Sequence, residues 1–274
     1  MNTPADPAAS SRYETLSTAH ALADLAREIS LRWFRRPIAV ELKSDASPVT
    51  QADREVEAAM RALLVQRHPG HGIDGEEHGV LGADRPFVWT LDPIDGTKSF
   101  ICGLPLWGTL IALLQGGHSV LGLIDMPVLG ERWVAWRGDA AWYVADGQAP
   151  VRCSTSGCPE LGAARLCAPS PDALGVAGRR AFDSLANRTA LVRHGGDCYA
   201  GAMLASGHLD LLLECGLGTQ DFLPMVAVVE VAGGTITDWQ GRPLGPRSSG
   251  EILVAATAAL HAQALAVLAA SQAD

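Results

Sequence analysis

The stretch from Trp89 to Phe100 constrains the fold more than any other part of the sequence. Residues 87–91 are apolar and rich in β-forming side chains, which predicts a buried strand. Pro93 has no N–H and a fixed φ, so we expect regular strand pairing to end there. Gly96 then permits a tight turn into a helical turn that begins near Lys98. The predicted unit is a strand that ends in a turn and a short helix.

Two carboxylates, Asp92 and Asp95, lie at the end of this predicted strand. Carboxylate oxygens are ligands for hard cations such as Mg²⁺, and the exposed N–H groups of a helix start bind phosphate. One interpretation is therefore metal-assisted chemistry on a phosphate ester. The alternative is a plain strand–turn–helix connection in which the aspartates only cap the turn. Three further stretches of the sequence favour the first interpretation.

The composition is that of a globular chain. Of its 274 residues, 48% are apolar and 19% are charged, which is enough for a substantial core in one large or two modest domains. The formal net charge of −9 argues against a nucleic-acid-binding surface, so we expect no nucleic acid among the partners. The apolar run at residues 106–114 is too short to cross a membrane.

The cysteines and the N-terminal residues indicate a cytoplasmic protein. Residues 1–11 are polar and lack the basic start and apolar core of a signal peptide. Six cysteines are scattered without a paired framework, and Cys153 and Cys158 have no matching second pair for a zinc site. Reduced thiols in a cytoplasmic protein are the favoured interpretation.

Two helices are predicted before the central stretch. Residues 13–35 place apolar side chains on one helical face. Thr50 is suited to be the N-cap of the second helix, with Asp53 completing a capping box. Capping alone would explain Asp53. The alternative role of Asp53 is to accept a proton from a hydroxyl group or a water.

A glycine-punctuated loop at residues 68–79 carries two adjacent acids, Glu76 and Glu77. Neighbouring side chains on an extended segment point in opposite directions, so we expect only one of them to face a metal. The loop also holds three histidines whose spacing fits neither a helical metal pair nor a zinc ribbon. We interpret them as ordinary loop residues: His68, His71 and His78.

The order of the remaining elements predicts two lobes. Four strands follow the central stretch as an antiparallel run, at residues 106–114, 120–124, 131–136 and 141–144. Residues 147–162 are rich in Gly, Pro, Ser and Cys, which indicates a boundary. We therefore expect an N-terminal α+β lobe at residues 1–150 with the metal-binding motifs, and a C-terminal α/β lobe at residues 151–274.

Strands and helices alternate in the second lobe. The predicted strands lie at residues 165–168, 190–192, 209–213, 235–238 and 252–255, and the predicted helices at residues 178–187, 198–206 and 255–270. Asp221 lies where a further helix should begin, and Gly233 and Gly234 lie where it should end.

Four stretches thus stand in a definite order: Ser47–Asp53, Gly75–Glu77, Asp92–Thr97 and a helix from Asp221 to Gly234. In this order they resemble the inositol monophosphatase-like family of Mg²⁺-dependent, lithium-sensitive phosphatases. The resemblance runs from about residue 13 to the C-terminus. Within the family, four further segments are most similar to the bacterial histidinol-phosphate phosphatases: residues 97–101, 103–109, 122–133 and 195–199.

The resemblance implies a fold and a metal site. The fold is α+β, a layered α-β-α-β-α sandwich of the inositol monophosphatase and fructose-bisphosphatase type, and it commonly forms a homodimer. Two or three Mg²⁺ ions would be held by five groups: Glu76, Asp92, the backbone carbonyl of Ile94, Asp95 and Asp221.

The resemblance also implies roles around the substrate. Asp53 and Thr97 would orient and activate the attacking water, while Gly96 and Thr97 would donate backbone N–H groups to the phosphate. Lys43 would help to complete a metal site, although it could be an ordinary surface lysine. Glu214 would contact the non-phosphate part of the substrate, although an exposed acid at a strand end is an equal alternative.

The expected function is hydrolysis of a small-molecule phosphate monoester, most specifically L-histidinol phosphate to L-histidinol in histidine biosynthesis. We expect direct attack of a metal-activated water without a phosphoenzyme. Gln220 stands where inositol-specific members usually have tryptophan, which disfavours inositol phosphate. The alternatives are a phosphatase of the same family for inositol 1-phosphate or another sugar or nucleotide phosphate, and a transcription-complex or RNA-associated partner. The intact acids and the net negative charge argue against the last.

Overall fold

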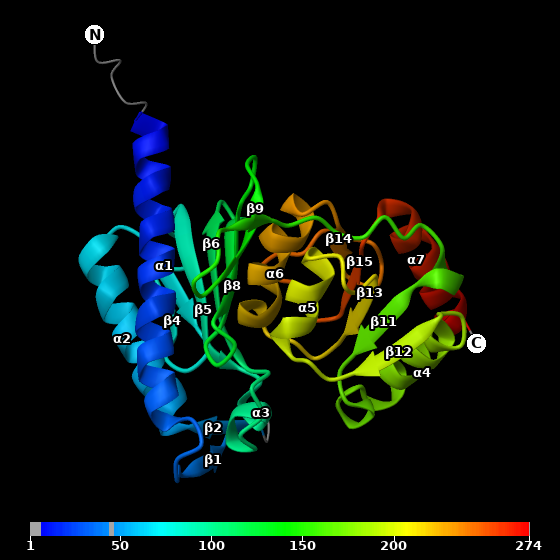
Figure 1. Ribbon diagram of the computed structural model, residues 1–274, viewed down its shortest axis with the longest axis horizontal. Coiled ribbons are helices and arrows are strands. Elements are labelled where there is room, and N and C mark those ends of the chain that lie inside the picture. The colour runs from blue at the N-terminus through cyan, green and yellow to red at the C-terminus, as the bar shows by residue number, and fades with distance from the viewer. Residues whose placement is uncertain (1–6, 44–46, 274) are drawn as a thin grey trace.

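The computed structural model describes residues 7–43 and 47–273, which form five layers in the order helix, sheet, helix, sheet, helix (Figure 1). An eight-stranded sheet and a five-stranded sheet each bury both faces under helices. This confirms the predicted α-β-α-β-α sandwich. No helix in these residue ranges is long and apolar enough to span a membrane.

The large sheet is almost entirely antiparallel. Its strand order is β10-β9-β8-β7-β6-β5-β3-β4, and only β3 and β5 run parallel to each other. The strands are β3 (Gly72–Gly75), β4 (Gly79–Leu81), β5 (Phe87–Asp95), β6 (Gly108–Gln115), β7 (His118–Met126), β8 (Glu131–Trp136), β9 (Ala141–Ala145) and β10 (Val151–Arg152). A separate hairpin consists of β1 (Val40–Leu42) and β2 (Pro48–Thr50).

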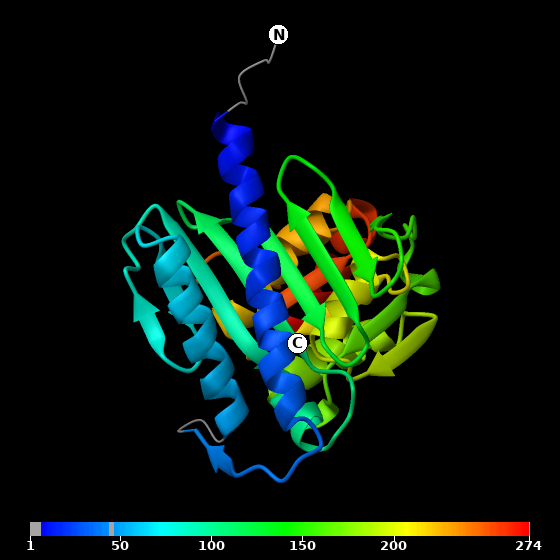
Figure 2. The ribbon, with the colours of Figure 1, turned by 60° about the vertical axis from the view of Figure 1, so that its left-hand side comes forward.

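Two helices, α1 (Pro7–Trp33) and α2 (Gln51–Arg67), cover the outer face of the large sheet (Figure 2). Their apolar stripes meet alternate residues of the strands, because successive strand side chains point to opposite faces. Leu22 and Met60 are fully buried against Trp89 and Leu113. The amphipathic pattern therefore predicted both helices correctly.

The middle layer consists of α5 (Cys198–Ala205) and α6 (Thr219–Val231). These helices are apolar on nearly all sides because each sheet covers one side of them. Helix α6 approaches the large sheet so closely that a Cβ atom at Gly122 of β7 would lie 2.1 Å from the carbonyl oxygen of Pro224.

The small sheet forms the fourth layer and has the order β12-β11-β13-β15-β14. Its strands are β11 (Arg165–Ala168), β12 (Leu191–His194), β13 (Leu211–Glu214), β14 (Thr235–Thr237) and β15 (Ile252–Ala255). Helices α4 (Gly175–Ala186) and α7 (Ala258–Ala273) cover its outer face, and short 3₁₀ turns lie at Leu161–Ala163 and Pro171–Ala173. The chain passes from the large sheet to the small one between β10 and β11, at residues 153–164.

Strand β5 differs from its prediction. Pairing with β6 is regular up to Asp92, becomes irregular, and resumes where Asp95 pairs with Gly108. Pro93 therefore interrupts the pairing, but the strand continues past it because a bulge absorbs the missing N–H. The carbonyl of Pro93 accepts a hydrogen bond of 2.9 Å from the Thr109 hydroxyl. The helical turn expected near Lys98 is α3 (Thr97–Ile101).

The close contact between α6 and β7 makes Gly122 intolerant of a side chain. We expect Gly122→Ala to lower the free energy of unfolding by about 1–3 kcal/mol, because the added methyl group must displace α6 from the sheet. Urea unfolding followed by circular dichroism measures the change. Gly157→Ala is the matched control, since nothing lies within 4 Å of its added Cβ. Equal stability of the two variants would contradict this packing.

Candidate active site

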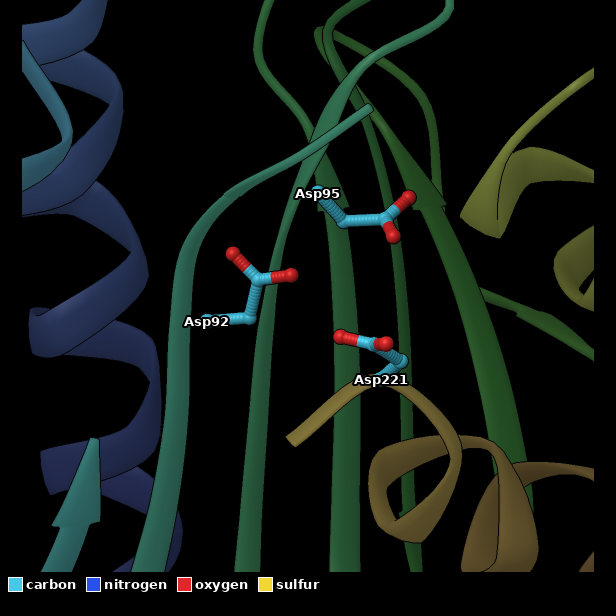
Figure 3. Close-up of side chains that lie close together, drawn as sticks. All are labelled: Asp92, Asp95 and Asp221. Carbon is cyan, nitrogen blue, oxygen red and sulfur yellow. The ribbon is translucent and has the colours of Figure 1, made fainter. Parts of the chain in front are cut away.

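Three carboxylates converge at the junction between the large sheet and the middle helices (Figure 3). Asp92 and Asp95 come from the end of β5, and Asp221 comes from the first turn of α6. One oxygen atom of each side chain lies within 4.8 Å of those of the other two. The structure thus brings together residues that are far apart in sequence and that the motifs predicted to share one site.

Backbone N–H groups hold each of these carboxylates in place. Asp92 Oδ1 accepts a bond of 3.0 Å from the N–H of Ile94, and Asp95 Oδ2 accepts one of 2.7 Å from Cys198 at the start of α5. Asp221 Oδ2 accepts a bond of 2.8 Å from Gly218, just before α6. Each carboxylate keeps a second oxygen for another partner.

The carboxylates repel one another in a partly buried setting, where Asp92 is buried and Asp95 and Asp221 are half-buried. Burial, followed by the charge of Glu76, raises the pKa of Asp92 well above its usual range. Burial, followed by the charge of Asp221, raises the pKa of Asp95 to about 8. Burial, followed by the charge of Glu76, raises the pKa of Asp221 to about 6. A hard divalent cation fits this donor set, because it supplies the positive charge that the four acids lack.

Glu76 lies beside the cluster in the tight connection between β3 and β4. Lys43 Nζ is 2.8 Å from Glu76 Oε1 and 2.6 Å from Glu77 Oε1, so one ammonium group bridges both acids. Burial lowers the pKa of Lys43, but its bonds to Glu76 and Glu77 outweigh burial and raise it overall. The expectation that these two acids point in opposite directions is wrong, because the segment is a turn rather than an extended strand.

Asp53 lies in the first turn of α2 and is buried. It accepts bonds from the N–H and the hydroxyl of Thr50, at 2.8 and 2.5 Å, and completes the predicted capping box. Burial raises the pKa of Asp53. The Thr97 hydroxyl donates to the carbonyl of Ile94 at 3.2 Å. Asp53 and Thr97 thus each bond to a residue three positions away in sequence. Among the described residues, no hydrogen bond joins Asp53 to Thr97.

A turn at Gly96 joins Asp95, at the end of β5, to the start of α3. Gly96 has a φ of 80°, in the left-handed region that favours glycine. A Cβ atom there would lie 2.8 Å from Asp197 Oδ2, so a larger residue would also collide with the neighbouring loop.

A cavity of about 590 Å³ extends from the cluster toward the small sheet. Its lining includes Asp95, Asp221, Asp197 and Glu214. Glu214 ends β13, and burial, followed by the charges of Asp95 and Asp197, raises its pKa well above its usual range. The structure therefore places Glu214 in the same cavity as the carboxylate cluster.

Asp197 was not predicted as a site residue. It has a φ of 46°, unusual for a residue with a side chain, and it accepts a bond of 2.6 Å from the Ser99 hydroxyl. The signal available in the sequence was the pair Gly195-Gly196 immediately before it.

Gln220 also has a structural role that the sequence did not reveal. Its side-chain amide donates a bond of 2.8 Å to Asp74 of β3, next to the helix turn that carries Asp221. This bond ties the start of α6 to the large sheet.

The remaining metal candidates do not form sites. His68 and His71 stack on each other with ring centroids 4.7 Å apart, and the His68 ring bonds to the Thr18 hydroxyl. His78 lies against the carbonyl of Arg54. All six cysteines are free thiols in the structure.

The five-layer fold and the partly buried acidic cluster are those of a phosphoric monoester hydrolase from a family that is generally metal-dependent. The model of the inositol monophosphatase family matches residues 12–273, so the chain belongs to that family.

Relatives of known name agree with this assignment. The chain is 42% identical over 255 residues to the chloroplastic bifunctional phosphatase IMPL2 of Arabidopsis thaliana, covering 90% of this chain and 72% of the relative. It is 37% identical to the histidinol-phosphatase of Mycobacterium tuberculosis, covering 92% and 97% of the two chains. A solved inositol monophosphatase from Zymomonas mobilis superposes with a TM-score of 0.84 at 41% identity, covering 94% and 98%.

The raised pKa values predict how metal-free protein responds to pH. A carboxyl group whose pKa is higher in the folded state binds more protons there, so its stabilising effect is lost as pH rises. We expect the stability of metal-free protein to fall between about pH 4 and pH 8, the window set by the unfolded pKa of about 3.9 and the values for Asp221 and Asp95. The melting temperature should drop over this window, by roughly 2–4 °C for each kcal/mol of stability lost in a chain of this size.

Asp95→Asn tests the origin of this loss. The amide oxygen can still accept from Cys198, but the charge is gone, so the pH-dependent loss of melting temperature should shrink. Mg²⁺ should restore stability to the parent protein at pH 8 and not to the variant. Asp183→Asn, on an exposed part of α4, is the control. If the melting temperature of Asp95→Asn falls with pH as steeply as that of the parent protein, repulsion at Asp95 does not cause the loss of stability.

Proposed function

We propose that the chain is a Mg²⁺-dependent histidinol-phosphate phosphatase, which releases L-histidinol and phosphate in histidine biosynthesis. The observation that carries the proposal is a pair of acids, Asp197 and Glu214, that lines the cavity beyond the carboxylate cluster, in a wall that also contains Lys98 and Arg193. A phosphate ester bound at the cluster extends its alcohol portion into this cavity. An ammonium group there gains charge–charge attraction to the acids in addition to hydrogen bonds, whereas the neutral hydroxyls of a sugar offer hydrogen bonds alone.

The relatives support the same substrate class. Histidinol-phosphatases from Streptomyces coelicolor and Chlorobaculum parvum are 35% and 34% identical to this chain and cover 93% and 92% of it. These identities exceed the 31% shared with an inositol-1-monophosphatase of Mesorhizobium japonicum. Gln220 supports the proposal further, since its amide bonds to Asp74 instead of offering an apolar face to a sugar ring.

The proposed metal site uses five groups of this chain: Glu76, Asp92, the carbonyl of Ile94, Asp95 and Asp221. Their chemistry suits two or three Mg²⁺ ions, and Lys43 joins them through Glu76. Bound Mg²⁺ supplies charge neutralisation for the phosphate dianion, a lower pKa for water, and stabilisation of the leaving alkoxide.

The remaining roles belong to neighbouring residues. Asp53 and Thr97 orient the attacking water and take its proton, for which the raised pKa of Asp53 is favourable. The N–H groups of Gly96 and Thr97 bind the phosphate at the start of α3. Attack is direct, and no phosphoenzyme forms. We also propose that the active protein is a homodimer, as the family resemblance implies.

Phosphatase activity for inositol 1-phosphate or another sugar or nucleotide phosphate is the second candidate. The 41% identity to a solved inositol monophosphatase favours it. The two candidates share the metal chemistry and differ only in what occupies the cavity.

A substrate panel separates the two candidates. We expect kcat/KM for histidinol phosphate to exceed that for inositol 1-phosphate by at least about 100-fold, because charge-assisted hydrogen bonds contribute about 1.5–3 kcal/mol each and two acids are available. Fructose 1,6-bisphosphate and 3′-phosphoadenosine 5′-phosphate complete the panel, and EDTA should abolish every activity. Similar rates on all four esters would refute the narrow substrate assignment and leave the family activity intact.

Glu214→Gln tests the acid that is proposed to read the amine. We expect KM for histidinol phosphate to rise roughly tenfold, the effect of losing about 1.4 kcal/mol, while kcat changes little. The rate with inositol 1-phosphate should stay within about twofold. Glu160→Gln, on an exposed acid outside the cavity, is the control. An equal loss on both substrates would assign Glu214 to the metal site or to stability instead.

A further inference from the structure

Glu57 is a fully buried carboxylate with no role in the proposed reaction. It lies on α2, one helical turn after Asp53, and its side chain reaches the connection between β3 and β4. Glu57 Oε2 accepts a bond of 2.6 Å from the N–H of Glu77. Glu57 Oε1 accepts bonds of 3.1 Å from the N–H of His78 and 2.7 Å from Arg61 Nε.

These bonds complete the hydrogen bonding of the turn that carries Glu76. The N–H of Glu76 donates to the carbonyl of Leu91 on β5 at 3.2 Å. The next two N–H groups donate to Glu57, and the guanidinium of Arg61 bonds to the carbonyl of Gly79 where β4 begins. Every N–H group from residue 76 to residue 78 therefore has a fixed acceptor.

The sequence makes room for this contact at one position. A Cβ atom on Gly75 would lie 2.0 Å from Glu57 Oε1 and 2.8 Å from an Arg61 guanidinium nitrogen. Only glycine lets the buried carboxylate approach the backbone of the turn so closely. The close approach of Glu57, and not an unusual backbone conformation, therefore accounts for the glycine at position 75.

We propose that Glu57 is a positioning residue whose negative charge fixes Glu76 as a metal ligand. Residues four apart on a helix share one face, so α2 holds Asp53 and Glu57 in register with each other. Through Glu57 the same helix also sets the turn that presents Glu76 beside Asp92. This inference rests on the proposed metal-binding role of Glu76.

Charge, and not shape alone, accounts for the arrangement. Three donors converge on the two oxygens of one carboxylate that has no contact with solvent. Glutamine has the same shape but replaces one acceptor oxygen with an NH₂ group, which faces an N–H donor. One donor then loses its acceptor, and the turn has to shift to find another.

Glu57→Gln provides the test, with Mg²⁺ binding to chelator-treated protein measured by isothermal titration calorimetry. We expect the Kd for Mg²⁺ to rise at least about tenfold, or about 1.4 kcal/mol. The rise in melting temperature on adding Mg²⁺ should shrink accordingly. At saturating Mg²⁺, kcat should recover to within about threefold of the parent value, because metal binding returns Glu76 to its place.

Two further variants complete the experiment. Glu55→Gln is the matched control, because Glu55 is on the same helix but bonds outward to Arg32 and Trp33. Arg61→Gln leaves Glu57 charged but removes the hydrogen bond from the Arg61 guanidinium that holds its side chain in place. This variant should raise the Kd for Mg²⁺ by about threefold. It gives the answer even if Glu57→Gln does not fold.

The outcomes are distinct. An unchanged Kd in Glu57→Gln, with equal losses of melting temperature in metal-free and Mg²⁺-loaded protein, would show a purely structural role and overturn the inference. An unchanged Kd in Arg61→Gln, if only that variant folds, would also overturn it. Parent protein that neither binds Mg²⁺ nor hydrolyses any ester would instead overturn the proposed function, and this inference with it.

Discussion

The repulsion among Asp92, Asp95 and Asp221 is the interaction on which the rest of the site depends. The fold forces these acids together, because the end of β5 and the start of α6 meet at the boundary between two layers. Asp92 is buried and the other two are half-buried, so water screens their charges only in part. The chain tolerates this cost because backbone N–H groups satisfy one oxygen of each acid, which leaves the others to a cation.

The architecture was largely predictable because its elements follow simple local rules. β8, β11 and β15 lie at the residues that apolar runs and flanking turns predicted. The length of β5 was not predictable from the sequence. Pro93 interrupts regular pairing as expected, but a bulge lets the pairing with β6 resume at Asp95. Strand geometry predicted that Glu76 and Glu77 point in opposite directions. They lie in a turn instead, and the ammonium group of Lys43 bonds to both.

Residues that support the site were harder to find than residues that form it. The ligand candidates stand in motifs, so one-dimensional order was enough to nominate them. Glu57, Asp74 and Asp197 each bond to a partner distant in sequence, and nothing in their immediate neighbours specifies that partner. The same holds for the N–H of Cys198, which reaches Asp95 only after the two sheets have packed around the middle helices.

The division of the ligand candidates between β5 and α6 has a consequence for biosynthesis of the chain. A ribosome releases the strand with Asp92 and Asp95 long before it has made Asp221. Any large sheet that folds during synthesis therefore does so with an incomplete carboxylate cluster. During that interval α5 is also absent, and its first N–H cannot yet restrain Asp95. The proposed metal site is therefore complete only late, when the middle helices pack against the sheet.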